Sequence, residues 1–148
     1  MRAWTLLAVF FAATALADEP PVSKEDVTVM VNALADCGGL YEAMSEFEKS
    51  LGHTNSSQNF HETSNGSVMA AAYLLLLEYE SVEGRPPKKL SDFTPYPQGR
   101  ADASKTSVLA SLERQDAKSV EDQAKKCGNL MPVQVDIIQM IRDRMVGR

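Results

Sequence analysis

Residues 67–80 read SVMAAAYLLLLEYE, and this stretch constrains the fold more than any other part of the chain. Its side chains leave no polar face until Glu78 and Glu80, so other segments must surround it. Alanine and leucine favour a helix, whereas a buried strand would contain more β-branched residues. The run is also too short to span a bilayer. It therefore predicts the central helix of a small helical bundle.

The N-terminus has the three parts of a secretory signal peptide. Arg2 supplies the positive charge, residues 3–13 are apolar, and residues 15–17 form a small-residue cleavage site before Asp18. Cleavage after Ala17 would leave a single helical domain, residues 18–148, that is long enough to bury a core. No second stretch is suited to span a membrane. We therefore expect a soluble protein in the bacterial periplasm, or in the secretory pathway of a eukaryotic host.

The two cysteines, Cys37 and Cys127, are expected to form a disulfide in an oxidising compartment. Neither belongs to a CxxC motif, so a redox enzyme is not indicated. In the chain-entropy model, a bridge closing a loop of about ninety residues stabilises the fold by roughly 4 to 5 kcal/mol. The alternative is a pair of buried free thiols.

A first helix is predicted from Ser23, which fits an N-cap, to Gly52, a favourable C-terminal stop. Gly38 and Gly39 each cost about 1 kcal/mol inside a helix relative to alanine, so a packing reason is expected. Next to Cys37, they would let another helix backbone approach closely, as a disulfide requires. The alternative is a helix that is broken at the glycines.

Residues 53–66 are polar, and two structures remain open for them: a loop, or a helix that continues into the apolar stretch. The spacing of Phe60, Ser64 and Ser67 favours a helix from about Ser56.

Residues 84–99 hold four prolines and two glycines, so helix is excluded over most of this connection. Phe93 and Tyr96 could anchor it on the bundle, either as a simple strap or as a functional loop.

A third helix is predicted from residues 101–104 to Cys127, with Gly128 as its C-cap and Asn129 as the N-cap of a last helix. These segments predict an all-α fold: a compact antiparallel bundle of about four helices, with one disulfide. The last helix contains an unusually high proportion of apolar residues for a terminal helix. Either it packs deeply against the bundle or part of it is a contact surface.

Motifs for catalysis, metal binding and cofactor binding are missing from the sequence. The pair His61-Glu62 lacks the second histidine of a zinc-protease motif, and His53 and His61 fit surface imidazoles. The net charge of −5, without basic clusters, argues against nucleic acid and anionic membranes as partners. The pair Lys88-Lys89 fits solvated loop lysines. We expect no enzyme, no metal and no cofactor.

The segment ADCGGLYEAMSEFEKSLG, residues 35–52, is followed by MAAAYLLL, residues 69–76. Together they resemble small exported helical proteins of Gram-negative bacteria, over about the first half of the mature chain. This resemblance transfers no site residues. Small exported helical proteins with a disulfide also include immunity proteins that neutralise toxins in the periplasm, an analogy of size, compartment and fold.

The leading functional hypothesis is a protein-binding module, such as an inhibitor or immunity protein, whose partner is another protein or a second copy of the chain. The expected contact residues are Ile138, Ile141 and Met145 in the last helix, and Phe93 and Tyr96 in the connection.

The alternative hypothesis is a carrier or sensor of a small apolar ligand or haem inside the bundle. Tyr41, Tyr73, Tyr79 and the methionines would line that site.

Overall fold

The structure, a computed structural model, describes residues 24–147 and contains four α-helices, one short 3-10 helix and no strand within them. The elements follow in the order α1 (Lys24–Ser50), α2 (Thr54–Glu80), η1 (Leu90–Phe93), α3 (Pro95–Glu113) and α4 (Ala117–Val146). The predicted all-α bundle is therefore confirmed. The predicted signal peptide, residues 1–17, lies outside the described residues, as does the predicted N-cap Ser23.

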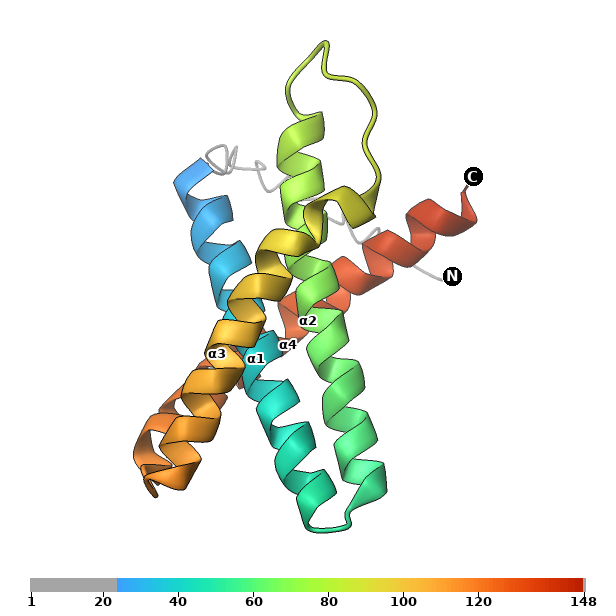
Figure 1. The fold of residues 1–148 in the computed structure, drawn as a ribbon. Helices are drawn as coiled ribbons and strands as arrows, with labels where there is room; N and C mark the ends of the chain where they lie inside the picture. The colour runs from blue at the N-terminus through green and yellow to red at the C-terminus, as the bar shows by residue number, and fades with distance from the viewer. Residues whose placement is uncertain (1–23, 148) are drawn as a thin grey trace, which may run out of the picture.

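α1 and α2 form an antiparallel hairpin that is closed by residues 51–53 (Figure 1). Gly52 has a φ of 80° in this turn, a conformation that glycine adopts without a steric penalty. α2 begins at Thr54, so residues 53–66 are almost entirely helical, as their spacing indicated. The polar start of α2 packs on α1 through a buried hydrogen bond, in which the Ser45 hydroxyl donates to the Ser57 carbonyl at 2.8 Å.

α1 is continuous through Gly38 and Gly39, so the alternative of a broken helix is wrong. A Cβ atom on Gly39 would overlap the backbone carbonyl of Ala101 in α3. A Cβ atom on Gly38 would lie 3.0 Å from the Val68 side chain of α2. The expected close packing exists, but the approaching helices are α3 and α2 rather than the helix that carries Cys127.

The second half of the connection is helical, contrary to the expectation from its prolines. α3 begins at Pro95 instead of residues 101–104, and η1 precedes it. Pro95 and Pro97 both lie in the first turn of α3, where backbone N–H groups have no helical acceptor. The two rings therefore break no helical hydrogen bond and support the start of the helix.

The chain turns between α3 and α4 at residues 114–116, and not at Gly128 as predicted. Gln115 has a φ of 58°, and the Asp116 carboxylate caps α4 by accepting a hydrogen bond from the Ser119 nitrogen at 3.1 Å. The predicted helix end at Gly128 and helix start at Asn129 are therefore wrong.

α4 continues through Gly128 and Pro132 because one of its faces is buried against the other helices. The buried side chains on this face are Cys127, Gln134, Ile137 and Ile141. Tertiary packing of such a face contributes more to helix stability than local propensity does.

α4 crosses behind α1 and α2, and its C-terminal half leads away from them (Figure 1). One apolar cluster joins α1, α2 and α4, and its largest buried members are Val31, Leu34, Tyr73, Leu76, Ile137 and Ile141. A second cluster joins α1, α3 and α4 and contains Cys37, Leu40, Ala43, Val108 and Cys127. The predicted disulfide between Cys37 and Cys127 is confirmed, and it joins the middle of α1 to the first half of α4.

Candidate functional site

The second half of α4 carries two rows of side chains. One row is buried against α1 and α2 and contains Gln134, Ile137 and Ile141. The other row runs along a neighbouring flank at spacings of four, three and four, and contains Met131, Val135, Ile138 and Arg142. In this second row, Val135 remains 58 % exposed. The flank therefore presents apolar surface that the bundle does not cover.

The second row borders an open crevice of about 540 Å³ between α4 and α2, here called the lateral crevice. Its α2 side is polar and consists of Asn59, Glu62, Thr63 and Gly66. Gln134 lies between the two helices, where its Nε2 donates to the Thr63 carbonyl at 3.1 Å and its Oε1 accepts from the Ser67 hydroxyl at 2.6 Å. A Cβ atom on Gly66 would lie 2.7 Å from Gln134 Nε2, so this glycine makes room for the amide. The crevice thus has a polar α2 wall and an α4 wall on which an apolar row stands beside the polar Gln139 and Arg142.

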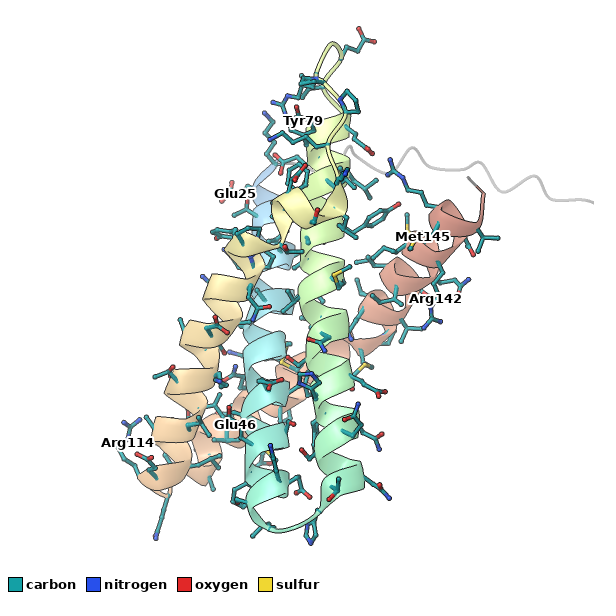
Figure 2. The ribbon with its side chains drawn as sticks, turned by 45° about the vertical axis from the view of Figure 1, so that its right-hand side comes forward. Glu25, Glu46, Tyr79, Arg114, Arg142 and Met145 are labelled. Carbon is teal, nitrogen blue, oxygen red and sulfur yellow. A yellow bond between two sulfur atoms is a disulfide. The ribbon has the colours of Figure 1, made fainter. Side chains whose placement is uncertain are left out.

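A second hollow, here called the end groove, lies between α2, the connection and the C-terminal end of α4. Its volume is about 290 Å³. Its walls are largely apolar and contain Met69, Tyr73, Leu76, Leu90, Ile141 and Met145. Figure 2 shows Met145 near the end of α4, where this helix leads away from α2. Three cations, Lys88, Lys89 and Arg144, complete the lining.

The three cations of the end groove differ in their partners. Arg144 donates hydrogen bonds of 2.8 and 2.6 Å to the two Glu80 oxygens, and this interaction raises the pKa of Arg144 above its ordinary value. Lys88 Nζ lies 5.5 Å from the centroid of the Tyr79 ring. Neither Lys88 nor Lys89 forms an ion pair with any carboxylate in residues 24–147. The Asp92 carboxylate nevertheless lies beside Lys89, because it accepts a hydrogen bond from the Lys89 backbone nitrogen at 2.9 Å. The groove therefore keeps a net positive charge and two lysines that form no ion pair within the described residues.

The three predicted contact residues of the last helix lie in three different environments. Ile138 lines the lateral crevice, and Met145 lines the end groove with 74 % of its surface exposed. Ile141 is buried in the core cluster, and its side chain also borders the end groove. The structure therefore divides these residues between two hollows on the two sides of the α2–α4 crossing.

The two predicted contact residues of the connection have partners within the bundle. The Phe93 ring packs against the Tyr79 ring with the centroids 5.5 Å apart. The Tyr96 hydroxyl donates to Asn32 Oδ1 at 2.7 Å. Both side chains therefore hold the connection and the start of α3 against the other helices.

The three tyrosines that the sequence placed in an interior ligand site lie in three separate parts of the bundle and do not line a common cavity. Tyr41 stacks on Phe60 between α1 and α2, with the centroids 6.4 Å apart, and its burial raises the pKa of the Tyr41 hydroxyl. Tyr73 forms part of the wall of the end groove. Tyr79 contacts the connection, where its hydroxyl donates to the Pro86 carbonyl at 3.1 Å.

A larger cleft of about 780 Å³ lies beside the disulfide, between α1, α3 and α4. Its charged groups are mostly paired: Asp36 with Arg100 at 2.7 Å and Lys118 with Asp122 at 2.8 Å. The Gln123 amide donates to the Asp36 carbonyl at 3.2 Å. The contacts of Asp36 join α1 to α3 and α4, so most of the charged groups of this cleft already have structural partners.

Both histidines pair with glutamates of α1: His53 Nδ1 lies 2.9 Å from Glu48 Oε2, and His61 Nδ1 lies 2.9 Å from Glu42 Oε2. Within residues 24–147, no three histidine, cysteine or carboxylate side chains gather as metal ligands would. In the same residues, no helix combines the length and the apolar character needed to cross a membrane.

Comparisons with known proteins found no matching family model, no matching curated protein and no matching solved structure. The interpretation of the two hollows therefore rests on their own geometry and chemistry.

Val135, Lys88 and Lys89 were not among the predicted site residues. The spacing of the second row is visible in the sequence, but the spacing alone does not say which row faces the core. The two lysines resemble ordinary loop residues until the connection folds back over α2 and places them beside apolar walls.

Proposed function

We propose that this chain is an exported protein-binding module, and that a helix of its partner docks in the lateral crevice. The observation that carries the proposal is the second row of α4, where Val135 is exposed and Met131 and Ile138 are only partly buried although α4 already buries another face. An amphipathic helix needs only one apolar stripe to pack on its own bundle. A further row of apolar side chains beside a hollow is typical of an interaction site.

The two walls of the crevice suit an amphipathic helix as the docked element. Its apolar residues, spaced by three and four, would contact the α4 row in the way that helices bind in grooves. Its polar residues would face Asn59, Glu62 and Thr63 on α2. Arg142 stands at the end of the row and makes no ion pair within the described part of the chain. A carboxylate of the partner near Arg142 would fix the direction of the bound helix.

The proposed export has its own test. The N-terminal sequence supports it, and so does the disulfide, since disulfides persist mainly in oxidising compartments. The intact mass of the protein recovered from its host should correspond to a chain that begins at Asp18. A chain recovered from the cytoplasm with residues 1–17 still attached and with reduced cysteines would refute export.

The docking proposal is tested with a pair of matched variants. Val135 and Val29 are both exposed valines on helices, at 58 % and 63 %, but Val29 lies on α1 outside the crevice. Tagged Val135→Asp and Val29→Asp proteins are used to capture partners from the exported fraction of the host. We expect Val135→Asp to lose the partner that both Val29→Asp and the unaltered protein retain, because the carboxylate would be desolvated against an apolar residue.

The contact itself is located by a photo-crosslinking amino acid placed at position 135 and, as a control, at position 29. A crosslink from position 135 to a foreign chain supports a hetero-complex, and a crosslink to a second copy supports self-association through the same surface. Retained capture by Val135→Asp, or crosslinks from position 29 alone, would refute the lateral crevice as the docking site.

A second candidate function, the binding of a small ligand, is favoured by one specific observation. The end groove combines apolar walls with two lysines, Lys88 and Lys89, that form no ion pair within the described residues. Such a groove differs from the interior site that the sequence suggested, because it opens at the surface between α2, α4 and the connection.

A further inference from the structure

We propose that the end groove binds an anionic amphiphile with a medium-length acyl chain. This inference rests on the second candidate function, for which it names the ligand class, and it is independent of helix docking in the lateral crevice. The chain of the ligand would lie between α2 and α4, and its head group would meet the lysines of the connection.

The walls of the groove define the apolar part of the ligand. Met69, Tyr73 and Leu76 lie on the α2 side, and Ile141 and Met145 lie on the α4 side. Two methionines and a ring give a surface that adapts to an unbranched chain. The volume of about 290 Å³ holds on the order of ten heavy atoms when each takes roughly the 30 Å³ of a water molecule.

The charges of the groove define the head group. Arg144 and Glu80 form a bidentate pair whose charges cancel, and the Asp92 carboxylate lies beside Lys89. Lys88, Lys89 and Asp92 together leave a local charge of about +1 on a chain whose net charge is −5. The Lys88 amine lies 5.5 Å from the centroid of the Tyr79 ring and 6.0 Å from that of Phe93, and Lys88 itself borders the groove. A carboxylate or phosphate head group would gain charge-assisted hydrogen bonds from these amines. A cationic head group would meet repulsion instead.

Other ligand classes use only half of these features. A small inorganic anion would contact the lysines but leave the apolar walls exposed to water. An uncharged hydrocarbon would fill the walls but gain nothing from the two ammonium groups. An anionic amphiphile satisfies both parts of the groove, which is the usual arrangement of a ligand site with apolar walls and few polar anchors.

The test compares ten-carbon ligands that differ in the head group: decanoate, decyl phosphate, decanol and decyltrimethylammonium. Each is titrated below its micelle concentration into the mature protein labelled with ¹⁵N, and the amide shifts locate the site. We expect decanoate or decyl phosphate to bind most tightly and to shift amides of Met69, Ile141 and Met145. The order of these two anions shows whether the natural ligand is a carboxylate or a phosphate.

Two variants and one control separate the contributions of charge and chain. Lys88→Ala/Lys89→Ala should weaken decanoate binding about tenfold or more, as expected for the loss of two charge-assisted contacts, and should leave decanol binding unchanged. Met145→Glu alters an exposed wall residue, so the protein should fold and bind both decanoate and decanol less tightly. The control Lys118→Ala/Lys125→Ala changes two exposed lysines of α4 far from the groove and should change neither ligand's affinity.

Three results would overturn the inference: equal or tighter binding of decyltrimethylammonium, shifts confined to other parts of the chain, or unchanged decanoate affinity in Lys88→Ala/Lys89→Ala. The Val135→Asp variant should bind decanoate normally. Retained partner capture by Val135→Asp would refute docking in the lateral crevice alone, and absent decanoate binding by the unaltered protein would refute the ligand site alone, so the two failures are distinguishable.

Discussion

Small residues decide where the helices of this bundle meet. Gly39 lets the α3 backbone approach at Ala101, and Gly66 gives space to the Gln134 amide between α2 and α4. The buried Ser67 hydroxyl then supplies a hydrogen bond to Gln134. A larger residue at Gly39 or Gly66 would push two helices apart. The packing of the bundle therefore depends on small residues at the helix contacts as well as on large apolar side chains in the core.

We predict opposite effects for alanine at two helical glycines. Gly39→Ala would press a Cβ atom into the backbone of α3, which cannot move aside as a flexible side chain can. It should lower the free energy of unfolding by about 1 to 3 kcal/mol or more. Gly128→Ala lies inside α4 with nothing within 4 Å of the new atom, so it should raise stability by about 0.5 to 1 kcal/mol.

Urea unfolding of both glycine variants beside the unaltered protein measures these differences. Two variants with equal stability would mean that α1 and α3 do not pack through Gly39. A destabilised Gly128→Ala would contradict a continuous α4 at that position.

Among the elements, the turn between α3 and α4 was the boundary that local sequence signals failed to predict. Leu109, Leu112 and Val120 keep a spacing that fits one helix running through residues 114–116. No glycine or proline marks the turn, because Gln115 occupies the left-handed conformation that glycine usually provides. The single positive signal was Asp116, whose carboxylate caps the next helix.

We predict that this turn can be strengthened and weakened by single substitutions. Gln115→Gly should raise the free energy of unfolding by about 1 kcal/mol because glycine relieves the steric cost of a positive φ. Asp116→Ala should lower it by about 1 kcal/mol through loss of the cap. Thermal unfolding of each variant is compared with Gln139→Gly, a control within α4 that should cost about 1 kcal/mol. If Gln115→Gly is as harmful as Gln139→Gly, the chain does not turn at this position.

The sequence predicted the helices better than their ends. Periodicity identified α1 and the helical start of α2, since both bury a stripe of side chains along most of their length. Proline and glycine commonly mark a helix end, but their effect depends on where they lie in the helix. Pro95 starts a helix because its ring lies in the first turn, and Gly128 lies within a helix because its neighbours are buried.

The candidate site was predictable only in part, for a related reason. The apolar surplus of the last helix indicated a contact surface, and Ile138 and Met145 do line hollows. The role of Val135 depends on which flank of α4 faces outward, and the role of Lys88 depends on how the connection folds back. Both are consequences of tertiary packing, which a local pattern does not contain.

In the whole molecule, the position of α4 determines the shape of both hollows, because α4 forms one wall of each. α1 and α2 form a hairpin through contacts along their lengths, whereas α4 crosses them and touches each over a shorter stretch. Three features hold it there: the Cys37–Cys127 disulfide, the Gln134 hydrogen bonds and the burial of Ile137 and Ile141.

We predict that loss of the disulfide loosens α4 first and weakens ligand binding before the hairpin unfolds. The bridge spans 90 residues, and removing it as Cys37→Ala/Cys127→Ala should cost about 2 to 5 kcal/mol because the unfolded chain regains conformational freedom. Hydrogen exchange should rise most in α4, since the disulfide ties its first half to α1, and least around Leu34 and Ala71. Decanoate affinity should fall with it, because the α4 wall of the end groove moves. If the variant keeps full protection in α4 and full decanoate affinity, the apolar and Gln134 contacts alone position this helix, and the disulfide acts only on the unfolded state.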